Sequence, residues 1–179
     1  MFGQFGGAKN ARDKAIKTIT ENLKIQLSGY IKFANLAEVI KNDAYIAGYI
    51  SGKLMSFIAY FIKAEGMPAE DANMVSGMVL LNLFGENQAR IVSQAIKANS
   101  SSETLQYIDG RNRGARIVTY AVGAQDVRKD SDYVRAIATF RKMEGKVGSR
   151  SESNNHWAAI TGLEQLWIGD RLAKYLKHA

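Results

Sequence analysis

The chain has 179 residues, of which 46% are apolar, and a formal net charge of +7 at pH 7. A chain of this length can bury one hydrophobic core of ordinary size, and it is too short to favour two domains that each have a core. We therefore expect one domain. Cysteine is absent from the sequence, which excludes disulfides, thiolate zinc sites and cysteine nucleophiles. His156 and His178 are the only histidines, and neither has a second histidine at helical spacing, so we expect no metal and no cofactor.

The first ten residues differ in composition from the rest of the chain. They are rich in glycine, and they lack the basic start and unbroken apolar stretch that export requires. We therefore interpret residues 1–10 as a flexible arm that precedes a single helical domain over residues 11–179. With the absence of cysteine, this favours a cytoplasmic location.

Helix is the predicted structure of most of the chain. Only one proline occurs, and apolar residues recur at spacings of three and four. The first helix is expected from Asn10, as its N-cap, to about Ser28, and a shorter one from Phe33 to Lys41. The expected fold is all-α, a single-domain bundle of about seven or eight helices.

Two longer helices form the expected centre of this bundle. Asp43 is suited to cap a helix over residues 44–64, and Gly66 to end it. Pro68 is suited to start the next helix, which reaches Phe84 before Gly85 closes it. Because the connection is short, we expect a central antiparallel pair of helices.

The second half of the chain gives less uniform signals. The serine run 100–102 is typical of a loop that caps a short helix ending at Gly110. Residues 115–123 are compatible with either helix or strand. The remaining expectations are a helix from Asp130 or Ser131 to about Glu144, an exposed loop over residues 145–154, a final helical region capped by Asn155, and a break at Gly169-Asp170.

The helix over residues 44–64 carries a ridge of small residues. Ala44, Gly48, Gly52 and Ser56 recur every four residues, so they share one slanting face. A glycine inside a helix costs about 1 kcal/mol relative to alanine, which close packing of another backbone can offset. The partner is either a neighbouring helix of the same chain or a second copy in a homodimer. A membrane span is disfavoured, because Lys53 lies near the middle of the stretch.

Other residues of the same helix form two further strips. The larger apolar side chains share one arc, and we expect them in the core: Ile46, Ile50, Leu54, Phe57 and Phe61. A polar strip lies between this arc and the small-residue ridge, and we expect its phenol and ammonium tips to reach water: Tyr45, Tyr49, Lys53, Tyr60 and Lys63.

Most of the net charge lies in residues 111–150, where ten Lys and Arg stand against four acids. Guanidinium groups present paired donors to phosphate, so this segment is a candidate surface for nucleic acid or another polyanion. The candidate residues are Arg111, Arg113, Arg116, Arg128, Lys129, Arg135, Lys142, Lys146 and Arg150. We expect loops to present the first five. Charged helix faces are usually only solvated, however, and the interspersed acids Asp126, Asp130, Asp132 and Glu144 can pair locally.

Two aromatic residues follow the predicted loop near the carboxyl terminus. His156 and Trp157 could stack on a base or a ligand. The simpler interpretation places Trp157 in the core with Trp167 and leaves His156 exposed in the first helical turn.

No catalytic signature accompanies these features, and catalytic residues cannot be assigned from the sequence. We expect a non-enzymatic helical interaction or assembly module that associates with itself or binds another protein. Sequence-independent binding of nucleic acid or another polyanion through residues 111–150 is the alternative. An all-helical enzyme with an unrecognised site is the third possibility.

Overall fold

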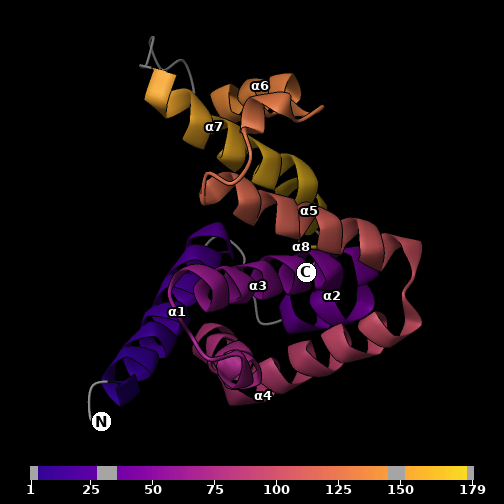
Figure 1. Ribbon diagram of the computed structural model, residues 1–179. Coiled ribbons are helices and arrows are strands. Elements are labelled where there is room, and N and C mark those ends of the chain that lie inside the picture. Colours follow the sequence, from indigo (N-terminus) through magenta and orange to yellow (C-terminus); the bar gives the residue numbers. More distant parts are fainter. Residues whose placement is uncertain (1–3, 28–35, 145–151, 177–179) are drawn as a thin grey trace. The chain divides into compact units, whose positions relative to one another are not determined.

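The computed structural model describes residues 4–27, 36–144 and 152–176. These residues form helices and no strand, which confirms the all-α prediction. The helices are α1 (Gln4–Leu27), α2 (Leu36–Asn42), α3 (Ala44–Ala64), α4 (Ala72–Ser102), α5 (Leu105–Ala121), α6 (Tyr133–Glu144), α7 (Glu152–Glu164) and α8 (Asp170–Leu176) (Figure 1). Short 3-10 turns cover Ala69–Asp71 and Val127–Lys129, and a π-helical turn covers Gln165–Gly169.

The residues group into two compact units, 1–115 and 116–179. Helix α5 crosses the boundary, so its first part belongs to unit 1 and its last part to unit 2. Each unit has its own packed helices. The single domain over residues 11–179 stays a prediction.

Helix α3 has the ends that its sequence predicts. The Asp43 side chain accepts a hydrogen bond from the backbone N–H of Ile46 at 3.1 Å, which caps the helix. At the other end, Gly66 takes a positive φ of 70°, and the N–H of Met67 donates to the carbonyl of Phe61 at 3.1 Å. This is the glycine-dependent closure expected at a helix C-terminus.

Helix α4 is interrupted where the sequence predicts a stop. Gly85 has φ 72° and ψ 169°, far from helical values, so α4 consists of two parts joined at this residue. Such a backbone conformation is open to glycine and strained for other residues. The predicted helix before Gly85 is present, and a second helical part follows this residue.

Several predicted helix boundaries are wrong. Helix α1 begins at Gln4, so Asn10 lies inside it, and most of the expected arm is helical. Helix α7 begins at Glu152, so Asn155 is not its cap, and of the predicted loop over residues 145–154 only residues 152–154 are described, as helix. The sequence pattern alone locates helix ends poorly, because a residue that caps helices well can also occur one or more turns inside a helix.

The serine run is helical, contrary to the prediction of a loop. The hydroxyl of Ser101 donates to the carbonyl of Lys97 at 3.0 Å, and that of Ser102 donates to Asn99 at 3.0 Å. These hydroxyls therefore bond to their own helix instead of capping the next one. The chain turns one residue later, at Glu103, which has a positive φ of 44°. Thr104 then accepts from the N–H of Tyr107 at 3.3 Å at the start of α5.

Helix α5 continues through the segment that the sequence leaves between helix and strand. It runs to Ala121 without ending at Gly110. Arg111, Arg113 and Arg116 are consequently helical, and the prediction that loops present them is wrong. Arg128 and Lys129 do lie in a short connecting turn.

The core of unit 1 is shared by several helices. Helix α3 packs against α1, α2 and α4, and α4 in turn also packs against α1 and α2. Figure 1 shows α3 in the middle of this unit, with α4 on one side and the first part of α5 on another. The large apolar arc of α3 is buried as predicted. The antiparallel pair α3–α4 as the single centre of the core is not confirmed.

The prediction that the polar strip of α3 reaches water is wrong for three of its residues. Tyr45, Tyr49 and Lys53 are buried, and Lys53 is only 1% exposed. Gln26 of α1 satisfies two of these groups, since its carbonyl oxygen accepts from Lys53 Nζ at 2.6 Å and its amide donates to Tyr49 Oη at 3.0 Å. A sequence pattern cannot show this, because the amide that makes the burial possible lies on another helix.

Unit 2 is built around α6 and α7, which pack against each other. Gly162 of α7 lies directly against the backbone of Ala136 in α6, and a Cβ at Gly162 would come within 2.6 Å of the Ala136 carbonyl carbon. Trp167 is buried as predicted, whereas Trp157 is 56% exposed, which corrects its predicted place in the core. The predicted break at Gly169-Asp170 is a π-helical turn that leads directly into α8.

Candidate functional site

The small-residue ridge of α3 faces the first part of α5. A Cβ at Gly48 would clash with the carbonyl group of Tyr107 and lie 3.0 Å from the backbone nitrogen of Arg111. A Cβ at Gly52 would lie 2.7 Å from the Arg111 carbonyl carbon. Ala44 and Ser56, at the two ends of the ridge, are half-buried. The two central glycines therefore allow a backbone contact within one chain.

Helix α5 contributes matching glycines to the same crossing. A Cβ at Gly110 would lie 3.0 Å from the backbone nitrogen of Tyr49, and one at Gly114 would lie 2.9 Å from that of Lys53. Contacts advance in the same direction along both helices, so α3 and this part of α5 run parallel. Next to the crossing, the hydroxyl of Tyr107 donates to that of Ser51 at 3.1 Å. Four glycines from two helices thus bring the backbones together, and the ridge is not available to a second copy.

The arginines of the basic segment are largely engaged with acids nearby. Each of the following pairs has a nitrogen–oxygen distance of 3.0 or 3.1 Å: Arg113 with Asp109, Arg116 with Asp130, Arg128 with Asp126, and Arg135 with Asp132. Lys129 and Lys142 are exposed, and Arg111 is half-buried in α5. Lys146 and Arg150 lie outside the described residues. Of the described candidates, Arg111 and Arg113 belong to unit 1, and Arg116, Arg128, Lys129, Arg135 and Lys142 belong to unit 2.

Asp130 is the centre of a polar network in unit 2. One of its oxygens accepts from the Tyr120 hydroxyl at 2.6 Å and from Arg116 at 3.1 Å, while the other accepts from the backbone N–H of Asp132 at 2.8 Å. Burial would raise the pKa of Asp130, but these hydrogen bonds outweigh it and lower the pKa. Burial, followed by the hydrogen bond to Asp130, raises the pKa of Tyr120.

The same network includes the buried tryptophan. The guanidinium carbon of Arg116 lies 5.6 Å from the centroid of the Trp167 ring, within the range of a cation–π contact. The Trp167 indole N–H donates to Asp132 at 2.9 Å, and Asp132 also pairs with Arg135. Arg116 therefore links the last part of α5 to Asp130 and Trp167, whereas Arg135 pairs with Asp132 at the start of its own helix. The charge pattern alone does not separate these roles from anion binding.

Comparisons with known proteins give no further direction. No protein-family model, curated protein or solved structure matches the chain.

A further surface feature lies on α4, and the site predictions from the sequence missed it. Between Asp71 and Glu86 the chain has no charged residue. Val75, Val79 and Leu83 are buried on the inner side of the helix. On the opposite side, Met74, Met78 and Leu81 are 43%, 39% and 40% exposed. We call the exposed residues Asn73, Met74, Gly77, Met78, Leu81 and Asn82 the outer face of α4.

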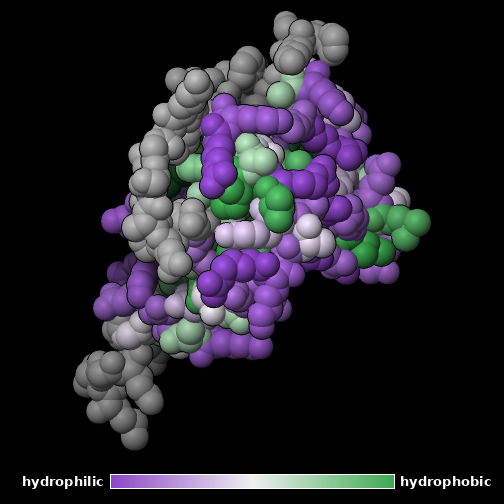
Figure 2. All heavy atoms as spheres, turned by 90° about the horizontal axis from the view of Figure 1, so that it is seen from above, coloured by the Kyte–Doolittle hydropathy of each residue, from purple (hydrophilic) through white to green (hydrophobic). Residues whose placement is uncertain are grey.

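Gly77 lies in the middle of this outer face. In helical projection it falls within about 100° of Met74, Met78 and Leu81. A Cβ at Gly77 would meet nothing within 4 Å, in contrast to the glycines of the α3–α5 crossing. The sequence signal for this surface is the absence of charged residues from positions 72–85, which is unusual for a helix with an exposed side. Figure 2 gives a different view, from above, in which small apolar patches interrupt a largely hydrophilic surface.

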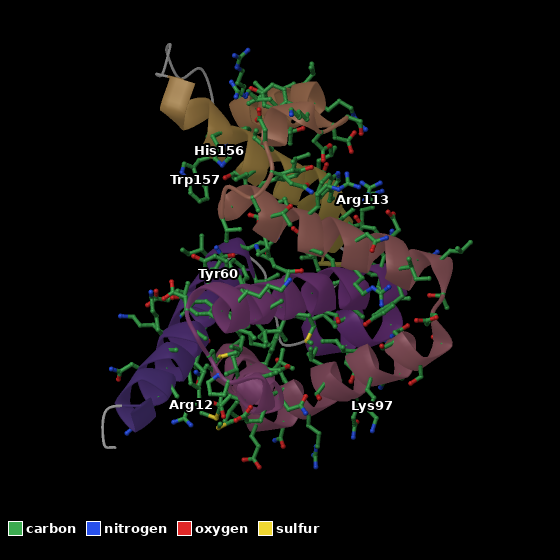
Figure 3. All side chains as sticks on the ribbon, in the orientation of Figure 1. Arg12, Tyr60, Lys97, Arg113, His156 and Trp157 are labelled. Atoms are coloured by element: carbon green, nitrogen blue, oxygen red, sulfur yellow. The ribbon has the colours of Figure 1, made fainter. Side chains whose placement is uncertain are left out.

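Two rings lie together near the start of α7 (Figure 3). The His156 and Trp157 rings meet edge to face, with centroids 5.7 Å apart. His156 is half-buried, and its Nε2 lies 3.2 Å from the carbonyl oxygen of Tyr120, which corrects the prediction of an exposed side chain. One His156 nitrogen is therefore engaged with the backbone of α5, and the exposed Trp157 is the part of this pair that faces outward.

The described residues also bear on metal binding and on membrane insertion. Among the described residues, no group of three or more His, Cys, Asp or Glu side chains is placed to hold a metal ion. Helix α3 is long and apolar enough to cross a membrane, but 72% of its most apolar 18 residues are buried inside the structure. Core helices of soluble proteins meet the same criterion, so this is weak evidence for a span.

Proposed function

We propose that the protein is a non-enzymatic helical assembly module that associates with itself. The observation that carries the proposal is the outer face of α4, where Met74, Met78 and Leu81 are exposed within a stretch, residues 72–85, that contains no charged residue. Exposed apolar stripes on soluble domains commonly mark surfaces of interaction. Methionine side chains are flexible and polarizable, which suits them to contact surfaces. A cytoplasmic location is part of the same proposal.

The α3 ridge is not the surface used in this proposal. Gly48 and Gly52 already contact α5 within the chain. A second copy would have to displace α5, and Tyr107 with it, to reach them. Association through α4 requires no such rearrangement.

The test is the mass of the full-length protein as a function of concentration. Sedimentation equilibrium should show the mass rising from that of the 19.7 kDa chain towards twice this value as concentration increases. Because the contact is apolar, added salt should leave the association unchanged or strengthen it. A mass that stays at one chain throughout would contradict the proposal.

A second candidate function is binding of nucleic acid or another polyanion. The observation that supports it is an excess of positive charge. Residues 111–142 contain eight basic and three acidic residues, so ion pairs with these acids cannot neutralise every base. Lys129 and Lys142 are both exposed. These two lysines are better probes than Arg116 or Arg135, because removing either arginine also breaks contacts inside unit 2.

Retention on heparin tests this second function. The double variant Lys129→Ala with Lys142→Ala should elute at lower salt than the wild type if the segment binds phosphate or sulfate groups. The matched control is Lys9→Ala with Lys17→Ala, which removes two exposed lysines from α1. Equal shifts for both double variants would show that only net charge matters, and would remove the segment as a specific site.

A further inference from the structure

We propose that helix α6 binds the surface of an anionic lipid bilayer through its outward-facing side. The inference rests on the second candidate function, binding of a polyanion through the basic segment. It names the kind of polyanion and the residues that contact it. The protein lies on the bilayer surface and does not cross it.

The outward-facing side of α6 consists of exposed residues, which we call the outer face of α6: Val134, Arg135, Ala138, Arg141 and Lys142. In helical projection they fall within about 120° of one another. Ala136, which is fully buried and lies against Gly162 of α7, points the opposite way. Figure 1 shows α6 packed along α7, with its other side directed away from that helix. The outer face of α6 therefore points away from the core of unit 2.

The outer face of α6 carries positive charge that local acids do not neutralise. Residues 133–143 contain three basic residues and no acid. Arg135 pairs with Asp132 at 3.0 Å, at the start of the helix. Arg141 and Lys142 are exposed in its last part, and neither forms an ion pair with any residue that the structure describes. Two cations are therefore available to anionic groups outside the chain.

An apolar strip runs between the cations of this face. Val134 is 77% exposed, and Ala138 lies about one turn further along the same side. In projection, Arg141 falls on one side of this strip, and Arg135 and Lys142 fall on the other. The long stems of arginine and lysine let the charged groups reach lipid headgroups while the apolar strip enters the acyl boundary. This order of apolar centre and basic edges is complementary to an anionic bilayer surface.

The same arrangement suits nucleic acid less well. Binding of single strands uses exposed aromatic rings on which bases stack. The two aromatic residues of α6, Tyr133 and Phe140, are half-buried and lie outside the outer face. A double helix presents phosphates, which bind cations and gain nothing from an exposed valine. The observations favour a lipid surface, and nucleic acid is the alternative that the experiment must separate.

The measurement is cosedimentation of the full-length protein with lipid vesicles. Vesicles of phosphatidylcholine with phosphatidylserine should bind the protein, and vesicles of phosphatidylcholine alone should not. The double variant Arg141→Gln with Lys142→Gln should lower the partition coefficient at least about tenfold, because each cation near an anionic bilayer strengthens binding about fivefold. Added salt should weaken the binding of the wild type.

A matched control for this double variant lies on α4. Arg90→Gln with Lys97→Gln removes the same two charges from exposed positions of one helix. It changes the net charge by the same amount, so it measures the effect of net charge alone. This control should retain most of the binding to vesicles that contain phosphatidylserine. An equal loss in the two double variants would overturn the assignment to α6.

The apolar strip is tested separately by Val134→Ser. This substitution should lower vesicle binding severalfold, because it removes apolar surface that enters the bilayer. It should leave retention on heparin unchanged, since heparin offers no apolar phase. Ile25→Ser in α1 is the control, because Ile25 is 76% exposed, and it should leave vesicle binding unchanged. Circular dichroism checks that both variants fold like the wild type.

Failure of the inference and failure of the second candidate function are distinguishable. A wild type that binds neither heparin nor vesicles with phosphatidylserine overturns both. Retention on heparin that Lys129→Ala with Lys142→Ala lowers, without any binding to vesicles, overturns the lipid inference alone. Vesicle binding that Val134→Ser leaves unchanged, together with tighter binding to duplex DNA, assigns the face to nucleic acid and also overturns the inference.

Discussion

Gly52 of α3 lies directly against the backbone of Arg111 in α5, with no room between them for a Cβ atom. The two positions are far apart in the sequence, and the contact brings together helices that run parallel. This relationship gives the glycines of α3 a specific role, and it makes the α3–α5 crossing a sensitive point of unit 1.

Gly52→Ala should destabilise the protein. The added methyl group meets backbone atoms of Arg111, which cannot move aside as a flexible side chain would. Overpacking of this kind costs about 1–3 kcal/mol, even though alanine is the better helix former. Urea unfolding followed by circular dichroism measures the change. Gly7→Ala is the control and should be neutral or stabilising, and an equally harmless Gly52→Ala would show that the two backbones do not meet closely.

Asp43→Ala should lower the free energy of unfolding by about 1 kcal/mol. The substitution removes the oxygen that accepts from the N–H of Ile46, at an end of α3 that is buried. Asp43→Asn keeps a capping oxygen and should cost less. The comparison is made by thermal and urea unfolding, and equal losses in the two variants would attribute the effect to the charge instead of the cap.

Tyr120→Phe should destabilise unit 2 by about 1–3 kcal/mol. The change removes the hydroxyl that donates to Asp130 at 2.6 Å, and it leaves a buried carboxylate with fewer donors. Fluorescence of the buried Trp167 reports on the same unit during unfolding. Tyr60→Phe in α3, a half-buried tyrosine, is the control. Similar small effects in both variants would contradict a structural role for the Tyr120 hydroxyl.

The contribution of Asp130 to stability should disappear in acid. Its hydrogen bonds outweigh burial and hold its pKa below the usual range in the folded protein. The unfolded state therefore takes up the proton more readily, so this stability is present above the unfolded pKa of about 3.9 and is lost as pH falls through the folded value. The difference in unfolding free energy between wild type and Asp130→Asn should be larger at pH 7 than at pH 3. A difference that does not change with pH would contradict this assignment.

The helical pattern and the local stop signals were readable from the sequence alone. Asp43, Gly66 and Gly85 mark helix ends through interactions within a few residues, so their roles are visible without a fold. The small-residue ridge was also readable, because glycine spacing within one helix is local information. The serine run failed as a loop signal because serine can bond to its own helix as well as cap the next.

The identity of each partner was decided only by the tertiary structure. The sequence does not pair Gly48 and Gly52 with α5, or Lys53 with Gln26, because these contacts join residues far apart in the chain. The basic segment looked uniform as a sequence, yet Arg116 and Arg135 are tied to carboxylates of unit 2 while Lys129 and Lys142 stay exposed. Periodicity sets which residues share a helix face, whereas packing between helices decides which faces are covered and leaves the outer face of α4 exposed.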